Sequence, residues 1–345
     1  MTDQSLPPTG DIQSVRRLSR RNFLRIVACA GIAAWVGHAA LENLEAARVV
    51  RQSRVLMGTV VNLTLIVSDR ESAAAGEVAA HACLERMAEL EAVLSRFKED
   101  SQVSILNRNG TLKNPHPALL ELVRQSHQIS ELSFGLFDIT ILPLLALYQK
   151  YHAAGGGLPV ETEIEAACQK IDYRKIIVNE SDLAFTETGM GITLDGIAKG
   201  YIVDEGVNRL VEYGFSNVLV EAGGDLVAGG RQGFDGGWKI GIQSPRRRSE
   251  RLVARFDAFD EAVATSGDYM QPFTADFAQH HILNPKTGRS SPALASATVI
   301  APNLAIADAM ATALMVMEPA KGLALVRELG LRALLVTKDM TLLQA

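Results

Sequence analysis

A carboxylate and a hydroxyl lie four residues apart in an otherwise apolar stretch near the C-terminus. Asp308 and Thr312 are surrounded by Ala, Leu and Met from residue 307 to residue 315, which predicts a largely buried helix. A buried carboxylate is costly unless it is paired or binds a metal. Positions i and i+4 share one helix face, and oxygen ligands without Cys or His suit Mg²⁺. The pattern is equally typical of an Asp that caps free N–H groups, with Thr312 bonding back to a carbonyl, so both interpretations stay open.

A glycine-bearing turn, TLDGIAKG at residues 193–200, follows a predicted strand and opens a predicted helix. Glycines let the backbone approach a ligand closely, and a helix N-terminus beside a lysine favours phosphate. The segment matches neither a P-loop nor the dinucleotide-binding fingerprint. The alternative is a helix cap in which Asp195 caps the backbone and Lys199 is solvated.

Two neighbouring histidines, His280 and His281, precede an apolar pair and a turn. Adjacent residues on a strand face opposite ways, so at most one of them should reach a cleft. Two polar segments, EAGGD at 221–225 and TSGDY at 265–269, also follow apolar strands, and no GxSxG nucleophile motif is present. Considered singly, each of these segments predicts only a turn.

The N-terminal 40 residues have the pattern of an export signal. Arg20 and Arg21 precede Phe-Leu, and residues 26–40 carry no Asp, Glu, Lys or Arg. This apolar run is shorter than the roughly 20 residues of a membrane span, and the paired arginines resemble a twin-arginine signal. We therefore expect residues 1–40 to be a signal segment and the protein to work in the periplasm. An ordinary secretory signal and an uncleaved N-terminal anchor are the alternatives.

The charge balance excludes whole classes of partner. The chain carries a net charge of −5, but residues 1–40 hold five Arg and two Asp, which leaves −8 for residues 41–345. An acidic body argues against a nucleic-acid footprint and against electrostatic binding to an anionic membrane. Beyond residue 40 the only cysteines are Cys83 and Cys168, which predict either one disulfide or two buried thiols.

Helical and strand patterns alternate irregularly along the rest of the chain, which favours an α+β fold. The glycine run at 155–157 predicts a division between two lobes near residues 153–160 of a single domain spanning 41–345. Helices are predicted at 71–97, 117–133, 139–152, 196–213, 303–317 and 319–329, and strands at 55–67 (interrupted at 57–59), 175–178, 183–186, 218–221, 238–242, 252–256, 262–265, 297–300 and 333–336.

The motifs become specific when their order is considered. The ordered set resembles the ApbE family of FAD:protein FMN transferases over about residues 54–340. The TLDGIAKG segment and the twin-arginine signal resemble the NosX branch of that family, which is associated with maturation of nitrous oxide respiration. The motifs are MGT at 57–59, GLFDIT at 135–140, LDGIAKG at 194–200, GGD at 223–225, TSGDY at 265–269, HILNP at 281–285, and Asp308 with Thr312.

The resemblance implies a two-lobed fold of mixed sheet and helix, with the flavin site in the cleft between the lobes. Family members bind FAD and Mg²⁺ and pass the FMN phosphate to a threonine, sometimes serine, hydroxyl of a partner protein, releasing AMP. An exported partner, such as a membrane-bound respiratory flavoprotein, would suit the predicted signal. Two alternatives share the site: hydrolysis of FAD by water to FMN and AMP, and a non-catalytic flavin carrier.

The resemblance also assigns roles to residues. Asp308, Thr312 and the backbone carbonyl of Gly196 match the family's metal positions, and His281 matches its candidate general base. The positions that match flavin contacts are Met57, Phe97, Leu136, Phe137, Asp138, Thr193, Lys199 and Ile282.

Three positions depart from the family pattern. Thr193 stands where Asp is common, and Asp195 stands where Gly or Ser is usual. Residues two apart in an extended chain face the same side, so Asp195 is expected to supply the missing carboxylate and to bind the flavin cofactor. Phe97 replaces a common Tyr, and Asn284 replaces the usual Asp before Pro285.

Overall fold

The computed structural model describes residues 48–155, 157–232, 236–246 and 252–345. The predicted signal segment and Gly156 lie outside the described residues. At the centre is an eight-stranded sheet in which every pair of neighbours is antiparallel. Its order is β1 (Arg48–Leu56), β2 (Thr59–Val67), β6 (Val218–Ala222), β7 (Asp225–Gly229), β10 (Glu261–Gly267), β11 (Leu294–Ala301), β12 (Arg332–Thr337) and β13 (Leu342–Gln344).

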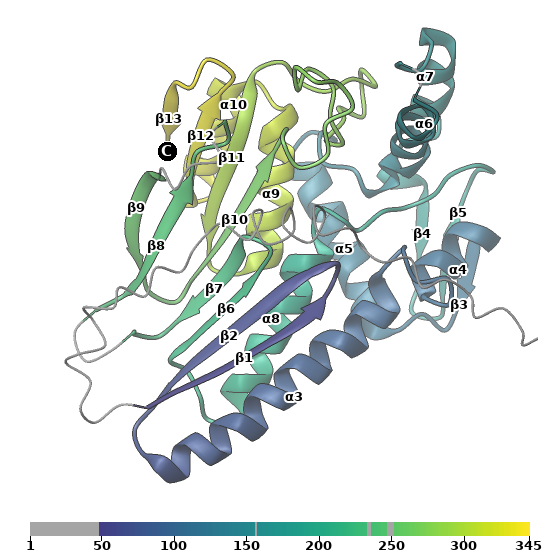
Figure 1. Ribbon diagram of the computed structural model, residues 1–345. Helices are drawn as coiled ribbons and strands as arrows, with labels where there is room; N and C mark the ends of the chain where they lie inside the picture. The colour runs from purple at the N-terminus through teal and green to yellow at the C-terminus, as the bar shows by residue number, and fades with distance from the viewer. Residues whose placement is uncertain (1–47, 156, 233–235, 247–251) are drawn as a thin grey trace, which may run out of the picture.

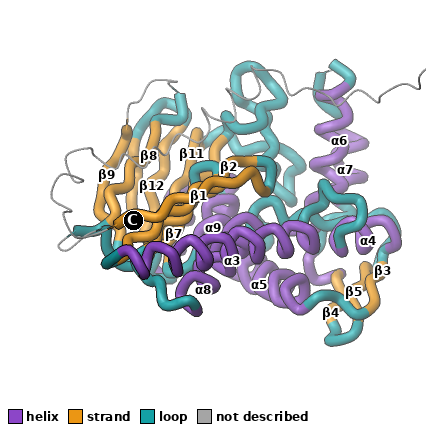
Figure 2. The backbone as a smooth tube through the Cα atoms, turned by 60° about the horizontal axis from the view of Figure 1, so that its bottom comes forward, coloured by secondary structure: helices purple, strands orange, loops and turns teal. Residues whose placement is uncertain are grey.

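Three helices cover one face of this sheet: α3 (Arg70–Leu94), α8 (Ala198–Glu212) and α9 (Leu304–Val316) (Figures 1 and 2). The alternation of side chains along β6 explains how the helices pack on the sheet. Val218 and Val220 lie in the core that the helices share, while Leu219 between them lies in a separate core on the opposite face. The sheet is therefore buried on both faces near its centre.

A hairpin of β8 (Trp238–Gln243) and β9 (Leu252–Ala258) covers that opposite face. Trp238 is fully buried there against Leu219, Leu226 and Val263, and its indole N–H donates to the Gly229 carbonyl at 2.9 Å. An indole that buries its ring and satisfies its N–H fixes the hairpin on the sheet.

Apart from α10 (Pro319–Glu328), which packs beside β12, the remaining elements extend beyond one end of the sheet (Figure 1). Helices α6 (Leu142–Ala153) and α7 (Glu161–Cys168) share a small core around Tyr148, Ile164 and Leu283. The glycines at 155 and 157 lie between these two helices, and the division into lobes near 153–160 stays a prediction. The other elements are α4 (Gln102–Asn109), α5 (Pro117–Leu132) and a small sheet of β3 (Thr111–Lys113), β5 (Asp182–Phe185) and β4 (Ile176–Val178).

The α+β class predicted from the sequence is confirmed, with one change in its first strand. The single interrupted strand at 55–67 is instead the hairpin of β1 and β2, because Met57 and Gly58 both adopt positive φ angles, +53° and +71°, and reverse the chain. Cys83 and Cys168 are both free thiols. Within the part of the chain that is described, no helix has the length and hydropathy needed to cross a bilayer.

Candidate functional site

The N-termini of α8 and α9 meet at the centre of the site. A Cβ atom on Gly200 would lie only 2.4 Å from the Leu304 carbonyl oxygen, so only glycine allows this approach. The Gly200 backbone N–H donates to Oδ2 of Asp308 at 3.2 Å. Asp308 therefore faces the first turn of the neighbouring helix.

The three predicted metal positions converge at this point. A Cβ atom on Gly196 would lie 3.0 Å from Oγ1 of Thr312, so the Gly196 backbone lies directly against that hydroxyl. Asp308 lies one turn earlier on the same face of α9, and the Ser266 and Thr312 hydroxyls are 3.3 Å apart. The Thr312 hydroxyl thus lies beside both the Gly196 backbone and the Ser266 hydroxyl, and the metal role of these positions stays a prediction.

Lys199 supplies positive charge to this cluster. Its ammonium forms an ion pair with Oδ2 of the buried Asp225, whose Oδ1 accepts the Thr265 backbone N–H at 2.9 Å. Burial would lower the pKa of Lys199, but the charges of Asp225 and Asp308 raise it overall. Burial raises the pKa of Asp308, which is only 5% exposed, although Lys199 opposes this shift. Lys199 therefore stays cationic between two acidic groups, the arrangement expected where phosphates or a metal will bind.

The donor set fits Mg²⁺ rather than zinc. Asp308, Thr312 and the Gly196 backbone offer only oxygen atoms, and Mg²⁺ takes few protein ligands while keeping waters and substrate phosphates. Nowhere in the described ranges do three His, Cys, Asp or Glu side chains gather as a metal site. The glycine at 196 leaves open the space beside Thr312 that a side chain would otherwise fill.

His281 and His280 occupy different environments, in a segment that forms no regular strand. His281 is half-buried; its backbone N–H donates to the Gln271 carbonyl at 3.1 Å, and its buried Nδ1 has no hydrogen-bond partner among the described residues. Burial lowers the pKa of His281 to about 4, although the Asp195 and Asp268 charges oppose this shift. The imidazole of His281 is therefore neutral at neutral pH, the form that accepts a proton.

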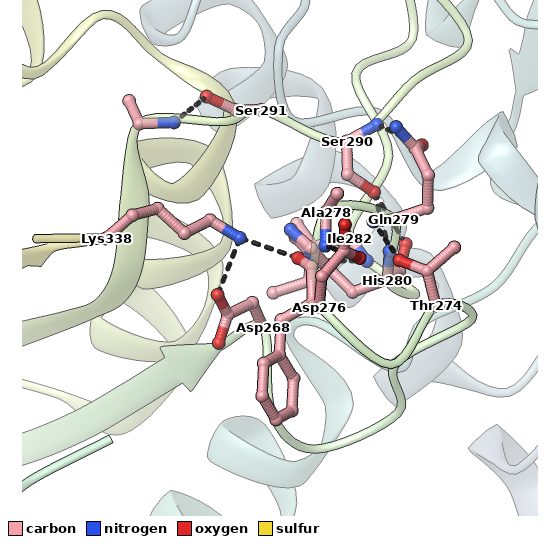
Figure 3. Close-up of polar contacts among 12 residues, drawn as sticks. Asp268, Thr274, Asp276, Ala278, Gln279, His280, Ile282, Ser290, Ser291 and Lys338 are labelled. Carbon is pink, nitrogen blue, oxygen red and sulfur yellow. Dashed lines mark hydrogen bonds and ion pairs between the residues drawn. The ribbon is translucent and has the colours of Figure 1, made fainter. Parts of the chain in front are cut away.

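His280 is fully buried and holds the backbone of the same segment. Its Nδ1 accepts the Ile282 backbone N–H at 3.3 Å, and its own backbone N–H donates to the Ser290 hydroxyl at 2.9 Å. That hydroxyl donates in turn to the His280 carbonyl at 2.8 Å. Figure 3 shows His280 beside Ser290 in this network. Burial, with smaller contributions from His281 and Lys338, lowers the pKa of His280 to about 3.

A buried carboxylate with two cations fixes the loop that leads to these histidines. Asp268 is fully buried and accepts from both terminal nitrogens of Arg246 at 2.6 Å, and it pairs with the Lys338 ammonium at 2.7 Å. Lys338 also donates to the Phe277 carbonyl at 2.6 Å. Figure 3 shows the ammonium of Lys338 beside the Asp268 carboxylate. Sequence reasoning treated the segment around Asp268 as a turn and did not identify Arg246 or Lys338.

The residues matched to flavin contacts divide into two groups. Met57 and Leu136 are half-buried, while Phe137 and Ile282 are buried, and Phe137 lies close to Gly196. Both carboxylate oxygens of Asp138 are engaged by neighbouring residues, and its contact with flavin stays a prediction. Its Oδ1 accepts from the Thr140 backbone N–H at 2.8 Å and from the Thr140 hydroxyl at 2.7 Å, and its Oδ2 accepts the Tyr173 N–H at 3.0 Å. The Asp138 carboxylate thus caps the short helix that follows it and positions Phe137.

Asp195 lies in a turn, so the extended-chain alternation behind its prediction does not apply here, and its backbone N–H donates to the Thr193 hydroxyl at 3.2 Å. A role of Asp195 in flavin binding stays a prediction. Thr193 is buried, whereas the Asp195 side chain is 41% exposed in a turn. Oδ2 of Asp195 accepts from Arg96 Nη2 at 2.7 Å, and the Arg96 guanidinium lies 4.1 Å from the centre of the Phe97 ring. Phe97 is 72% exposed. The three residues lie together beside the start of α8, with Asp195 and Phe97 exposed and the Arg96 side chain only 13% exposed.

Comparison with known proteins gives one consistent result. Residues 57–335 match the ApbE family. The FAD:protein FMN transferase of Escherichia coli (strain K12) is 30% identical over 263 residues, which span 72% of this chain and 73% of that protein. The fold is similar to the crystal structure of the ApbE protein from Thermotoga maritima, with a TM-score of 0.77 and 28% identity over 86% of this chain and 97% of that one. It is also similar to the apo form of the Pseudomonas stutzeri flavinyl transferase ApbE, with a TM-score of 0.73 and 28% identity over 88% and 97% of the two chains.

Proposed function

This chain belongs to the ApbE family, and we propose that it transfers the FMN moiety of FAD to a threonine or serine hydroxyl of another protein. The observation that carries the proposal is the convergence of Asp308, Thr312 and Gly196 beside the Lys199 ammonium. A magnesium ion and a pyrophosphate both require such a site. The named function of the relatives from E. coli and other bacteria supports the same assignment.

Mg²⁺ would be held by the Asp308 carboxylate, the Thr312 hydroxyl and the Gly196 backbone. When bound, it would neutralise charge on the pyrophosphate oxygens. Lys199 adds a fixed positive charge at the start of α8, where the helix N-terminus also favours an anion. These residues would bind and orient the pyrophosphate before the acceptor arrives.

His281 would receive the proton of the acceptor hydroxyl. In the proposed step the hydroxyl oxygen forms a bond to the FMN phosphorus, the bond from that phosphorus to the bridging oxygen breaks, and AMP leaves with that oxygen. A neutral imidazole is needed for this role, and burial keeps His281 neutral above a pKa of about 4. The fixed backbone of His280 and Ile282 holds the imidazole in place.

The test is direct. The full chain is incubated with FAD, Mg²⁺ and a candidate acceptor domain, and the acceptor is weighed by mass spectrometry. A gain of one FMN on a threonine or serine, absent for Asp308→Asn and absent without Mg²⁺, is the expected result. Release of FMN and AMP with an unmodified acceptor would assign the chain as a hydrolase instead.

The place of action and the acceptor class belong to the same proposal. The twin-arginine pattern in residues 1–40 supports export to the periplasm, and it makes an exported protein, such as a membrane-bound respiratory flavoprotein, the expected acceptor. The TLDGIAKG segment and this signal together support the NosX branch. Fractionation of cells expressing the chain with Arg20 and Arg21 replaced by lysine tests the export step, since the variant should stay in the cytoplasm.

A further inference from the structure

The first turn of α9 is capped in part by a residue of α8. The carboxylate of Asp204 accepts two backbone N–H groups, from Leu304 at 2.8 Å and from Ala305 at 2.9 Å. The residue at the usual capping position, Asn303, accepts only the Ile306 N–H, at 3.0 Å. Two of the free N–H groups that begin every helix are thus satisfied by a neighbouring helix.

The capping is reciprocal. Asp204 of α8 accepts from the first turn of α9, and Asp308 of α9 accepts from Gly200 in the first turn of α8. Gly200 and Asp204 are four residues apart and share one face of α8. The Leu304 carbonyl would lie 2.4 Å from a Cβ at Gly200, so the helices have no room to move closer.

We infer that Asp204 is a positioning residue for the metal site, because it fixes the register of α9 on α8 and thereby sets Asp308 and Thr312 opposite Gly196. The hydrogen bonds of the Asp204 carboxylate go to the first turn of α9, and through that turn it acts on these three residues. Its two oxygens hold consecutive N–H groups, which fixes the rotation of α9 about its axis as well as its position. Rotation is the variable that decides whether residues 308 and 312 face Gly196.

The inference rests on the proposed function for the presence of a metal ion. The contacts between α8 and α9 do not depend on that function. Partners that orient metal ligands change metal affinity by about 10- to 100-fold when they are replaced. Asp204→Asn keeps the size of the side chain and one acceptor oxygen. Its amide nitrogen is a donor, so it cannot accept the second backbone N–H. Asn303→Ala is the matched control, because it removes a cap from the same turn of α9 without breaking a contact to α8.

The experiment measures Mn²⁺ binding to the full chain by electron paramagnetic resonance, with and without FAD, beside thermal melting and the Mg²⁺ dependence of transfer. We expect Asp204→Asn to weaken Mn²⁺ binding about 10-fold or more. Its Mg²⁺ concentration for half-maximal transfer should rise by a similar factor, with the rate largely recovered at saturating Mg²⁺. Asn303→Ala should lower the melting temperature and leave Mn²⁺ binding unchanged.

Equal Mn²⁺ affinity for Asp204→Asn and wild type, or an equal loss in both variants, would overturn the inference. If Asp204→Asn does not fold, Gly200→Ala takes its place, since its Cβ must displace α9, and unchanged Mn²⁺ binding in that variant would overturn the inference equally. Wild-type protein that binds no Mn²⁺ would also overturn it. Wild-type protein that binds Mn²⁺ but transfers no FMN would instead overturn the proposed function and leave the metal result standing.

Discussion

Lys199, in the first turn of α8, forms an ion pair with Asp225, the first residue of β7. The pair joins the helix that begins at the site to the sheet on which it lies. Asp225 also accepts the Thr265 N–H, so the same carboxylate fixes the end of β10. Three segments that are distant in sequence are held together by one carboxylate.

Replacing Lys199 with methionine should destabilise the protein, because Asp225 would remain buried without its cation. Removing one partner of a buried pair costs about 3–5 kcal/mol, and since the Lys199 side chain is 27% exposed, we expect the lower end of that range. Urea unfolding of Lys199→Met measures the loss.

The matched control is Asp225→Asn combined with Lys199→Met. The double variant should recover part of the stability lost in the single one, because no unpaired charge remains. If the losses of stability in Lys199→Met and Asp225→Asn simply add in the double variant, the two charges do not interact.

The pH at which the transfer rate declines on the acid side should lie well below the usual pKa of histidine. Burial lowers the pKa of His281 to about 4 from an ordinary value of 6.5. A general base works only when it is unprotonated, so the rate should hold as the pH falls through 6.5 and decline near pH 4. Single-turnover FMN transfer between pH 3.5 and pH 8 measures this decline. A midpoint of the decline near pH 6.5 would contradict the lowered pKa of His281.

Asp195→Ala should have a limited effect on FAD affinity. The Asp195 carboxylate is 41% exposed and already pairs with Arg96. An ion pair with such an exposed partner contributes about 0–1 kcal/mol, which is about fivefold or less in affinity. FAD affinity by fluorescence titration, with Thr193→Ala alongside, tests this. Loss of FAD binding in Asp195→Ala alone would contradict this expectation and support the hypothesis that Asp195 supplies the missing carboxylate.

Long periodic segments of the fold could be predicted from the sequence because their signal is local. The helix predicted at 117–133 is α5 at Pro117–Leu132, and the one at 303–317 is α9 at Leu304–Val316. Strands of three residues, such as β3 and β13, have too few alternating positions to give a pattern. The sequence does not predict the turn at Met57, because an interrupted strand and a hairpin differ only in the φ angles of two residues.

The site could be predicted only where its residues are neighbours along the chain or match a motif. Asp308 and Thr312 share a helix face, so their spacing alone indicated a common cluster. Arg246 reaches Asp268 from 22 residues away, and Arg96 reaches Asp195 from 99 residues away. Such contacts depend on how the elements pack, and single residue types carry no signal for them.

Replacing His280 should affect mainly stability, whereas replacing His281 should affect mainly catalysis. His280→Ala removes a fully buried side chain and leaves the Ile282 N–H without its acceptor, so the free energy of unfolding at pH 7.5 should fall by about 1–3 kcal/mol. His281→Ala should lower single-turnover transfer by about 10²- to 10⁴-fold while changing FAD affinity and stability little. Urea unfolding, FAD titration and transfer on each variant give the comparison.

The lowered pKa values of His280 and His281 also determine the direction in which the stability of the protein changes with pH. The folded-state pKa is lowered to about 3 for His280 and about 4 for His281, so the unfolded chain binds protons first as the pH falls below about 6.5. The stability that neutral histidines contribute is present above that value and is lost as the pH falls toward 3. His280→Ala should therefore be most destabilising near pH 7.5, and its difference from wild type should shrink by pH 5. A difference that grows toward acid pH would show that His280 is protonated in the folded protein and would contradict its buried, neutral position.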